Sequence, residues 1–204
     1  MKAVLISIQP KWCELIANGK KTIEVRKTKP KLETPFKVYI YMTKSYDTLF
    51  GYGKPKKLCV DGGKVIGEFV CNKIDRVAHC GTCNNDIRLN IVDENFYCKA
   101  LDCEYLNKCK LSYSEIEKYS NGGDVYGWHI SNLVIYDKPR GLWELYRKCE
   151  KTPCEGCEHL KYQGVNSDEY DYDCEFLGGR IPITKPPQSW MYVEEVKESD
   201  NNAQ

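Results

Sequence analysis

The 204-residue sequence lacks any apolar run near the ~20 residues that a membrane-spanning helix needs. Its first apolar stretch, within residues 1–6, is too short for a secretory signal peptide. These two absences predict a cytoplasmic protein that does not contact membranes. Thiols stay reduced in that compartment, so the 12 cysteines are expected to be metal ligands and buried thiols rather than disulfides.

The sequence also lacks an excess of charge of one sign, because 30 basic residues face 29 acidic ones and leave a net charge of +1. Such a chain is not a general polycation, so contact with nucleic acid must depend on a local patch. Candidate patches lie in the first third of the chain and in residues 45–61, with Lys20, Lys21, Lys27, Lys54 and Lys56. No phosphate-binding loop, dinucleotide-binding fingerprint or G-x-S-x-G motif is present, which disfavours those enzyme classes.

Residues 10–26 hold the most informative pattern. Pro10 suits the first turn of a helix, and Gly19 suits its end because glycine enters the left-handed conformation at low cost. The pattern then changes to the two-residue period of a strand, with Ile23 and Val25 on one face. The opposite face and the entrance to the strand carry polar groups, namely Lys21, Thr22, Glu24 and Arg26. This face predicts either a cleft wall or a solvated strand surface.

A second strand is expected over residues 63–74, where Glu68 is the single carboxylate. Alternation places Glu68 on one face with Ile66 and Val70. A charge among apolar neighbours is costly unless it is paired, and Lys21 or Arg26 are the candidate partners. The pair would be structural, or Glu68 would act as a general base, and the sequence leaves both interpretations open.

These two stretches resemble the signature of ASCH domains, relatives of the PUA-like RNA-binding barrels, at Gly19, Lys21, Glu24 and Arg26 and at the later Gly67-Glu68-Phe69. The resemblance covers roughly residues 1–148. It implies an α+β fold, a small PUA-like β-barrel with short helices and cysteine-rich insertions. It also implies that Glu68 lines a cleft opposite Lys21 and that the ligand is RNA or a modified nucleotide.

A cysteine-rich stretch follows this region. Four of its cysteines have the spacing C-x4-C-x2-C-x16-C, which suits one tetrahedral zinc ion held by Cys149, Cys154, Cys157 and Cys174. Four sulfur ligands leave no position for water, so this zinc would be structural. A second, more ambiguous set contains Cys80, Cys83, Cys98 and Cys103. The alternative for the first set is four unrelated thiols. The alternative for Cys80 and Cys83 is a redox-active pair, although the βαβ context expected for one is lacking.

The expected organisation has four parts. Residues 1–148 form an ASCH domain with a cysteine-rich insertion at about 75–124, and residues 149–189 form the zinc module. Residues 190–198 form a strand that returns to the barrel, and residues 199–204 are a disordered tail.

The zinc module can be tested directly. Protein purified without chelator should contain about one equivalent of zinc, and Cys157→Ser should remove most of it, because each thiolate supplies one of four ligands. Elemental analysis of both proteins measures this. A zinc content below about half an equivalent that does not change in Cys157→Ser would contradict the module.

Three functions fit these patterns. The first is an RNA- or nucleotide-binding module, whose contacts would be Lys20, Lys21, Thr22, Glu24, Arg26, Lys27, Lys54, Lys56 and Glu68. The second, implied by the resemblance, is a hydrolase acting on acetylated cytidine or RNA, with Lys21, Glu24 and Glu68 as catalytic residues. The family's amidases carry a threonine three residues after the lysine, whereas this chain has Glu24 there, which removes the expected nucleophile. The third is a zinc-containing adaptor that binds other proteins.

Overall fold

The structure is a computed structural model that describes residues 1–44, 62–81, 87–148 and 180–196. Its elements in chain order are β1 (Lys2–Ile8), α1 (Pro10–Ala17), β2 (Ile23–Arg26), β3 (Phe36–Met42), β4 (Lys64–Gly81), β5 (Ile87–Val92), β6 (Cys98–Ala100), α2 (Cys103–Cys109), α3 (Tyr113–Ser120), β7 (Val125–Arg140), the 3-10 helix η2 (Leu142–Glu144), β8 (Tyr146–Lys148), β9 (Arg180–Pro182) and β10 (Trp190–Glu194). No helix in these ranges is long and apolar enough to cross a membrane.

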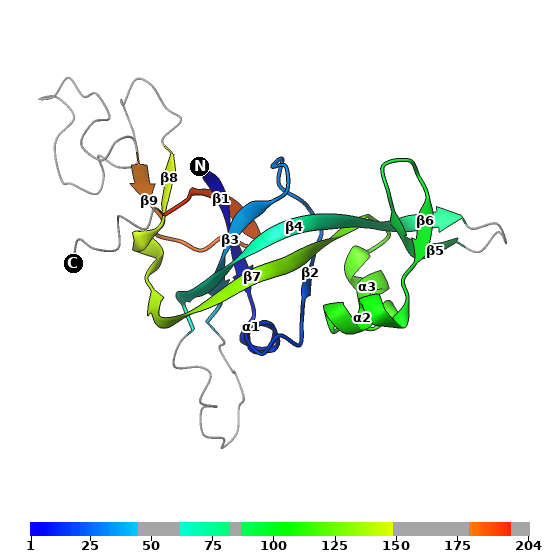
Figure 1. Cartoon of the computed structure of the whole chain (residues 1–204), viewed down its shortest axis with the longest axis horizontal. Helices are drawn as coiled ribbons and strands as arrows, with labels where there is room; N and C mark the ends of the chain where they lie inside the picture. Colours follow the sequence, from blue (N-terminus) through cyan, green and yellow to red (C-terminus); the bar gives the residue numbers. More distant parts are fainter. Residues whose placement is uncertain (45–61, 82–86, 149–179, 197–204) are drawn as a thin grey trace, which may run out of the picture.

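Eight strands form one mixed sheet (Figure 1). Its order is β10-β1-β3-β4-β5-β6, and β7 pairs with both β4 and β2. β1 runs parallel to β3 and antiparallel to β10, so β10 lies at the edge beside the first strand. The expectation of a closed β-barrel is wrong, because in the described part of the chain β2 pairs with β7 alone and no ladder joins it to β1. The α+β class is correct.

The main core lies between this sheet and α1. The Trp128 side chain is fully buried there and meets Phe36 edge to face, with ring centres 5.9 Å apart. Cys13 and Ile16 are the buried residues of α1. The helix predicted from residues 10–19 is confirmed, and Gly19 has φ +66°, the left-handed conformation that lets the chain turn into β2.

A β-bulge in β4 interrupts the simple alternation of side chains that its sequence predicts. Consecutive residues of β3 pair with Gly67 and Val65, which leaves Ile66 as the extra residue. Val65 and Tyr39 pack in one apolar cluster, whereas Ile66 packs in the main core. Glu68 is opposite Tyr39 in the ladder, so the prediction that it shares a face with Ile66 is wrong.

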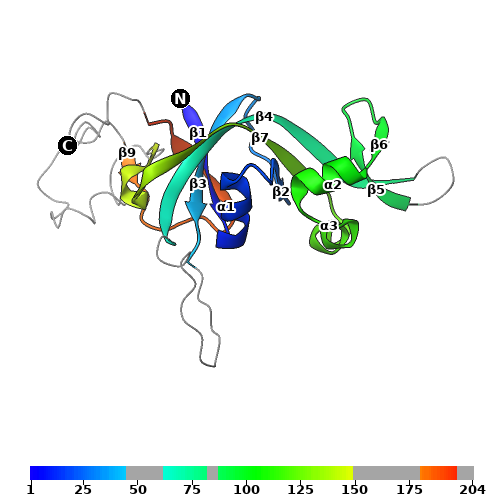
Figure 2. The same cartoon turned by 60° about the horizontal axis from the view of Figure 1, so that its bottom comes forward.

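Residues 75–124 extend the sheet to one side and carry α2 and α3 (Figures 1 and 2). Tyr105, Cys109 and Ile116 of these helices pack against Ile23 and Val25, the apolar face of β2. β2 therefore has an apolar contact on one face, and its polar face turns toward the interior beside α1.

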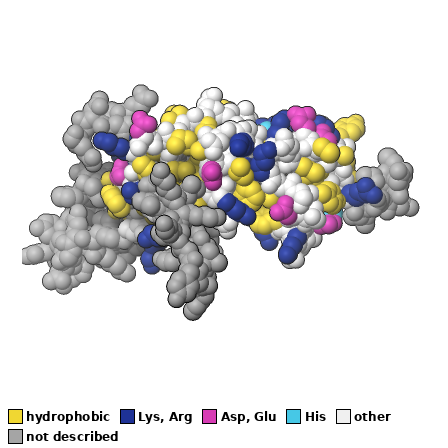
Figure 3. Space-filling view, turned by 90° about the horizontal axis from the view of Figure 1, so that it is seen from below, with side chains coloured by type: hydrophobic (Ala, Val, Ile, Leu, Met, Phe, Trp, Pro, Cys, Tyr) yellow, Lys and Arg dark blue, Asp and Glu magenta, His cyan; other side chains and the backbone are white. Residues whose placement is uncertain are grey.

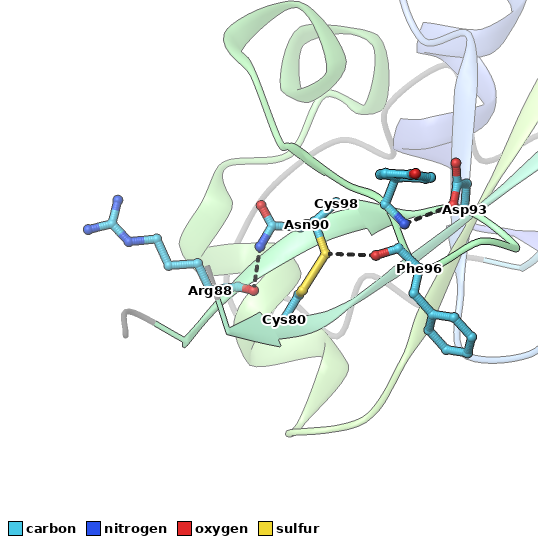
Figure 4. Close-up of a disulfide and its surroundings, with 7 residues drawn as sticks. Cys80, Arg88, Asn90, Asp93, Phe96 and Cys98 are labelled. Atoms are coloured by element: carbon cyan, nitrogen blue, oxygen red, sulfur yellow. Dashed lines mark hydrogen bonds between the residues drawn. A yellow bond between two sulfur atoms is a disulfide. The ribbon is translucent and has the colours of Figure 1, made fainter. Parts of the chain in front are cut away.

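A disulfide joins Cys80 of β4 to Cys98 of β6 (Figure 4). β5 pairs with both strands, which brings these cysteines together across 18 positions of sequence. The expectation that the chain has no disulfide is therefore wrong, and these two sulfurs are not available to the second zinc set. Of its other members, Cys103 is exposed and free, and Cys83 lies outside the described residues.

The described residues hold no group of three or more side chains that could bind a metal ion. All four cysteines of the predicted C-terminal zinc site fall in residues 149–179, outside the described ranges. That site remains a prediction from spacing.

Candidate functional site

A cleft of about 790 Å³ opens where β2 and β1 fail to pair. α1 lies on one side of β2, and α2 and α3 lie on the other (Figure 2). The described residues that line the cleft come from six parts of the chain: Ser7, Gln9, Trp12, Lys21, Glu24, Val25, Arg26, Tyr41, Thr43, Lys44, Leu111, Glu115, Tyr119, Pro186, Pro187 and Gln188. Seen from the α1 side, lysine and arginine side chains alternate with hydrophobic ones over the middle of the molecule (Figure 3).

Three charged side chains from the turn and strand after α1 meet at the cleft. Glu24 forms an ion pair with both neighbours: its Oε2 lies 3.3 Å from Lys21 Nζ, and its Oε1 lies 3.0 Å from Arg26 Nη2. The Lys21 side chain is 1% exposed and the Glu24 side chain 7%. The polar strand face predicted from the sequence is therefore a buried ion-pair triad with one net positive charge.

The Lys21 ammonium is held by α2 as well as by Glu24. It donates a 2.6 Å hydrogen bond to the backbone oxygen of Cys109, the last residue of α2. The adjacent Thr22 amide donates to the oxygen of Lys108 at 3.0 Å. The Trp12 ring centre lies 5.0 Å from the ammonium. The contacts of the Lys21 ammonium are therefore with groups inside the protein.

Arg26 spans the opening between the two unpaired strands. Its Nη2 donates a 2.6 Å hydrogen bond to the backbone oxygen of Ser7, near the end of β1. The Ser7 hydroxyl in turn donates to the oxygen of Pro187 at 2.6 Å, which brings the segment before β10 to the cleft. A side chain therefore makes the connection that a ladder would make in a closed barrel.

Glu68 lies elsewhere. Its Oε1 is 3.1 Å from Lys37 Nζ, and its Oε2 accepts a 2.5 Å hydrogen bond from the Tyr136 hydroxyl. Lys37 also approaches Glu195 at 3.6 Å. Burial favours a lower pKa for Lys37, but the hydrogen bond and charge of Glu68 hold that pKa above its usual value. The predicted pairing of Glu68 with Lys21 or Arg26 is wrong, because the bulge turns Glu68 toward Tyr39.

The remaining predicted ligand contacts have different positions. Lys20 and Lys27 are exposed, and Lys27 Nζ lies 5.2 Å from the centre of the Tyr119 ring. Thr22 is half-buried, and its backbone oxygen accepts from the amide of Ile130 at 2.9 Å. Lys54 and Lys56 lie outside the described residues.

The sequence analysis missed the α3 side of the cleft. Leu111, Glu115 and Tyr119 line it from residues that were assigned only to an insertion. Ser112 and Glu115 form a capping box, and the hydrogen bond from the Ser112 amide to Glu115 lowers the pKa of that carboxyl. A capping box is visible in sequence as a serine followed three residues later by a glutamate, but it predicts a helix and not where the helix docks.

A second polar pair lies on the α2 side of the sheet. Asp75 is buried, and its two oxygens lie 2.6 Å from His129 Nε2 and 2.7 Å from Lys73 Nζ. Burial raises the pKa of Asp75, but the hydrogen bonds from His129 and Lys73 outweigh this effect and leave the pKa below its usual value. His129 therefore has a buried carboxylate as its partner.

The family assignment rests on this same region. Residues 6–136, from β1 to β7, match the family model of the ASCH domain. The chain belongs to the ASCH-domain family. The match spans more than half of the sequence and includes the Lys21–Glu24–Arg26 triad as well as Glu68. At the family level, ASCH domains have nucleic-acid-binding or hydrolase-like roles.

One solved ASCH structure agrees with the fold. A tyrosine-to-phenylalanine variant of the ASCH protein from Zymomonas mobilis is similar to this chain at a TM-score of 0.50 and 16% identity, over 98% of this chain and 94% of that one. The unsubstituted protein from Zymomonas mobilis gives a TM-score of 0.49 at 16% identity, over 98% and 90% of the two chains. At this identity the first likeness supports the ASCH fold alone. No curated protein shows a significant match.

Proposed function

We propose that this ASCH domain binds RNA or a single nucleotide in the cleft between α1, β2 and α3. The observation that carries the proposal is the Lys21–Glu24–Arg26 triad in a cleft of about 790 Å³. That volume is typical of pockets for small organic ligands and nucleotides. The family's nucleic-acid-binding role supports the same ligand class.

The charge of the cleft and its rim supports an anionic ligand. Glu24 offsets only one of its two cationic neighbours, so the triad keeps a positive charge. Lys44 lines the cleft, and the exposed Lys20 and Lys27 flank β2. Phosphate groups of a bound strand would meet these lysines, since lysine binds phosphate as a point charge.

Hydrolysis of acetylated cytidine is the less favoured alternative. The Lys21 ammonium is held by Glu24 and by the Cys109 oxygen, and an ammonium has no lone pair with which to take a proton or to attack. Glu24 replaces the threonine of the family's amidases, and Glu68 is paired with Lys37. Of the three expected catalytic positions, one therefore carries a different residue, Glu24, and one, Glu68, lies away from the cleft.

Binding should depend on salt. A labelled single-stranded RNA of about ten nucleotides should bind more weakly as KCl rises, with a log–log slope of about −0.7 for each phosphate that the protein neutralises. Lys20→Ala and Lys27→Ala should each make the slope shallower by about 0.7. Fluorescence anisotropy over a salt series measures this.

Lys99→Ala is the matched control, because Lys99 is an exposed lysine in β6, outside the cleft lining. It should leave the slope unchanged. No measurable binding of either this RNA or a free nucleotide at low salt would contradict the proposed function. A slope near zero would show that the protein does not contact the phosphates of the RNA.

A further inference from the structure

Three aromatic side chains line the cleft, and they differ in what surface they offer. Tyr41 is 4% exposed, so its ring is buried in the core and offers little surface to a ligand. Trp12 is half-buried, and two ammonium groups lie near its ring centre, Lys11 Nζ at 4.3 Å and Lys21 Nζ at 5.0 Å. Tyr119 is 38% exposed. Tyr119 is therefore the most exposed aromatic residue of the described cleft lining.

Tyr119 is carried by a capped helix that packs against β2. Its helix begins with the Ser112–Glu115 capping box, and Ile116 of the same helix is fully buried against β2. Lys27 Nζ lies 5.2 Å from the Tyr119 ring centre, which is within the range of a cation–π contact. A ring held in this way loses little conformational entropy when a second ring stacks on it.

We propose that the cleft takes one unpaired nucleobase, stacked on the Tyr119 ring, so that the ligand class is single-stranded nucleic acid. This inference rests on the proposed function and extends it by naming the state of the strand and the residue that selects it. Stacking on an exposed aromatic side chain is sequence-tolerant, because every base has a π face. The bases of a duplex are already stacked on one another and would have to leave the helix to reach Tyr119.

Two amide side chains of the cleft lining could form hydrogen bonds with the edge of a base. Gln9 and Gln188 both line the cleft, and the Gln9 side chain makes no capping hydrogen bond to α1. An amide side chain offers one acceptor and two donors, which matches the mixed donors and acceptors of base edges. Lys27, beside the stacking ring, is placed to meet the adjoining phosphate.

The test compares Tyr119→Leu with the unsubstituted protein, using a short single-stranded RNA that contains 2-aminopurine. Leucine keeps apolar bulk and removes the aromatic face. Loss of one base–aromatic stack should weaken binding by about 5- to 150-fold and reduce the quenching of 2-aminopurine emission. Tyr119→Phe should bind within about twofold of the unsubstituted protein, since the π face remains. The same RNA annealed to its complement should bind at least about tenfold more weakly than the single strand.

Tyr97→Leu is the matched control, because Tyr97 is 74% exposed in the turn between β5 and β6 and is not part of the cleft lining. It should bind like the unsubstituted protein, and thermal melts should show that all variants are folded. If the unsubstituted protein binds RNA and Tyr119→Leu binds equally well, or if the duplex binds as tightly as the single strand, this inference is wrong and the proposed function stands. If the unsubstituted protein binds a free nucleotide but not the RNA at low salt, this inference is wrong and the proposed function stands. If it binds neither, both are wrong.

Discussion

Replacing Glu24 by glutamine should lower the free energy of unfolding by about 3–5 kcal/mol, because removal of one member of a buried ion pair leaves uncompensated charge in the interior. In this protein the substitution leaves two cations without their anionic partner, since Lys21 and Arg26 both pair with the same carboxylate. Glutamine keeps the size of the side chain, so the loss reports charge rather than a cavity. Urea denaturation monitored by fluorescence measures it.

Two further variants make this result specific. Glu68→Gln is the matched control, because Glu68 is 22% exposed and its partner Lys37 is 27% exposed, so its loss should be below about 1 kcal/mol. Lys21→Met should cost less than Glu24→Gln, since Glu24 retains Arg26 as a partner. Equal small losses for Glu24→Gln and Glu68→Gln would show that the triad is solvated and would contradict its burial.

The parts of the site that lie close together in sequence were predictable. The proline, the glycine and the change from a helical to a two-residue period place α1 and β2. The same alternation puts Glu24 and Arg26 on one face, with Lys21 at the entrance to the strand. The ion pairs themselves were not predicted, because the sequence analysis made Lys21 and Arg26 candidate partners of Glu68, whereas both pair with Glu24. The ASCH resemblance pointed to the same three residues, and the family match covers them.

The parts that depend on register and docking were not predictable. One extra residue at Ile66 changed the environment of Glu68. The neighbouring Gly67 is compatible with a bulge, but a glycine in a strand does not show where the extra residue falls. The disulfide between Cys80 and Cys98 depends on the order β4-β5-β6, which spacing alone does not reveal. Tyr119 reached the cleft because the α2–α3 segment docks on the apolar face of β2, a contact between segments about 90 residues apart in the chain.

That docking depends on one glycine, and Gly127→Ala should lower the free energy of unfolding by about 1–3 kcal/mol, the usual cost of overpacking. An added Cβ at Gly127 would collide with the Tyr105 hydroxyl of α2 and would lie 3.1 Å from Ile23 Cγ2. Gly127 pairs with Val25 of β2 and with Asp75 of β4. Strand pairing on both sides therefore prevents its backbone from moving away from α2. α2 must move instead.

The displacement of α2 should also reach the cleft. The Cys109 oxygen at the end of α2 accepts from Lys21, so Gly127→Ala is expected to weaken RNA binding as well as stability. Gly123→Ala is the matched control, because its added Cβ would have the Ser120 oxygen at 3.5 Å, an ordinary van der Waals contact. Chemical denaturation and anisotropy on both variants separate a local steric effect from a general effect of replacing glycine.

Removal of the Tyr105 hydroxyl should relieve the collision. That hydroxyl is buried and has no hydrogen-bond partner among the described residues, and burial raises the pKa of Tyr105 far above its usual value. Tyr105→Phe alone should therefore be neutral or stabilising, because it removes a desolvated polar group without breaking a hydrogen bond. In the Gly127→Ala background it should restore part of the lost stability, which gives a coupling energy of about 0.5–3 kcal/mol in a double-mutant cycle. A loss of more than about 1 kcal/mol for Tyr105→Phe alone would mean that the hydroxyl makes a stabilising hydrogen bond, and additive losses in the cycle would mean that the two groups do not collide.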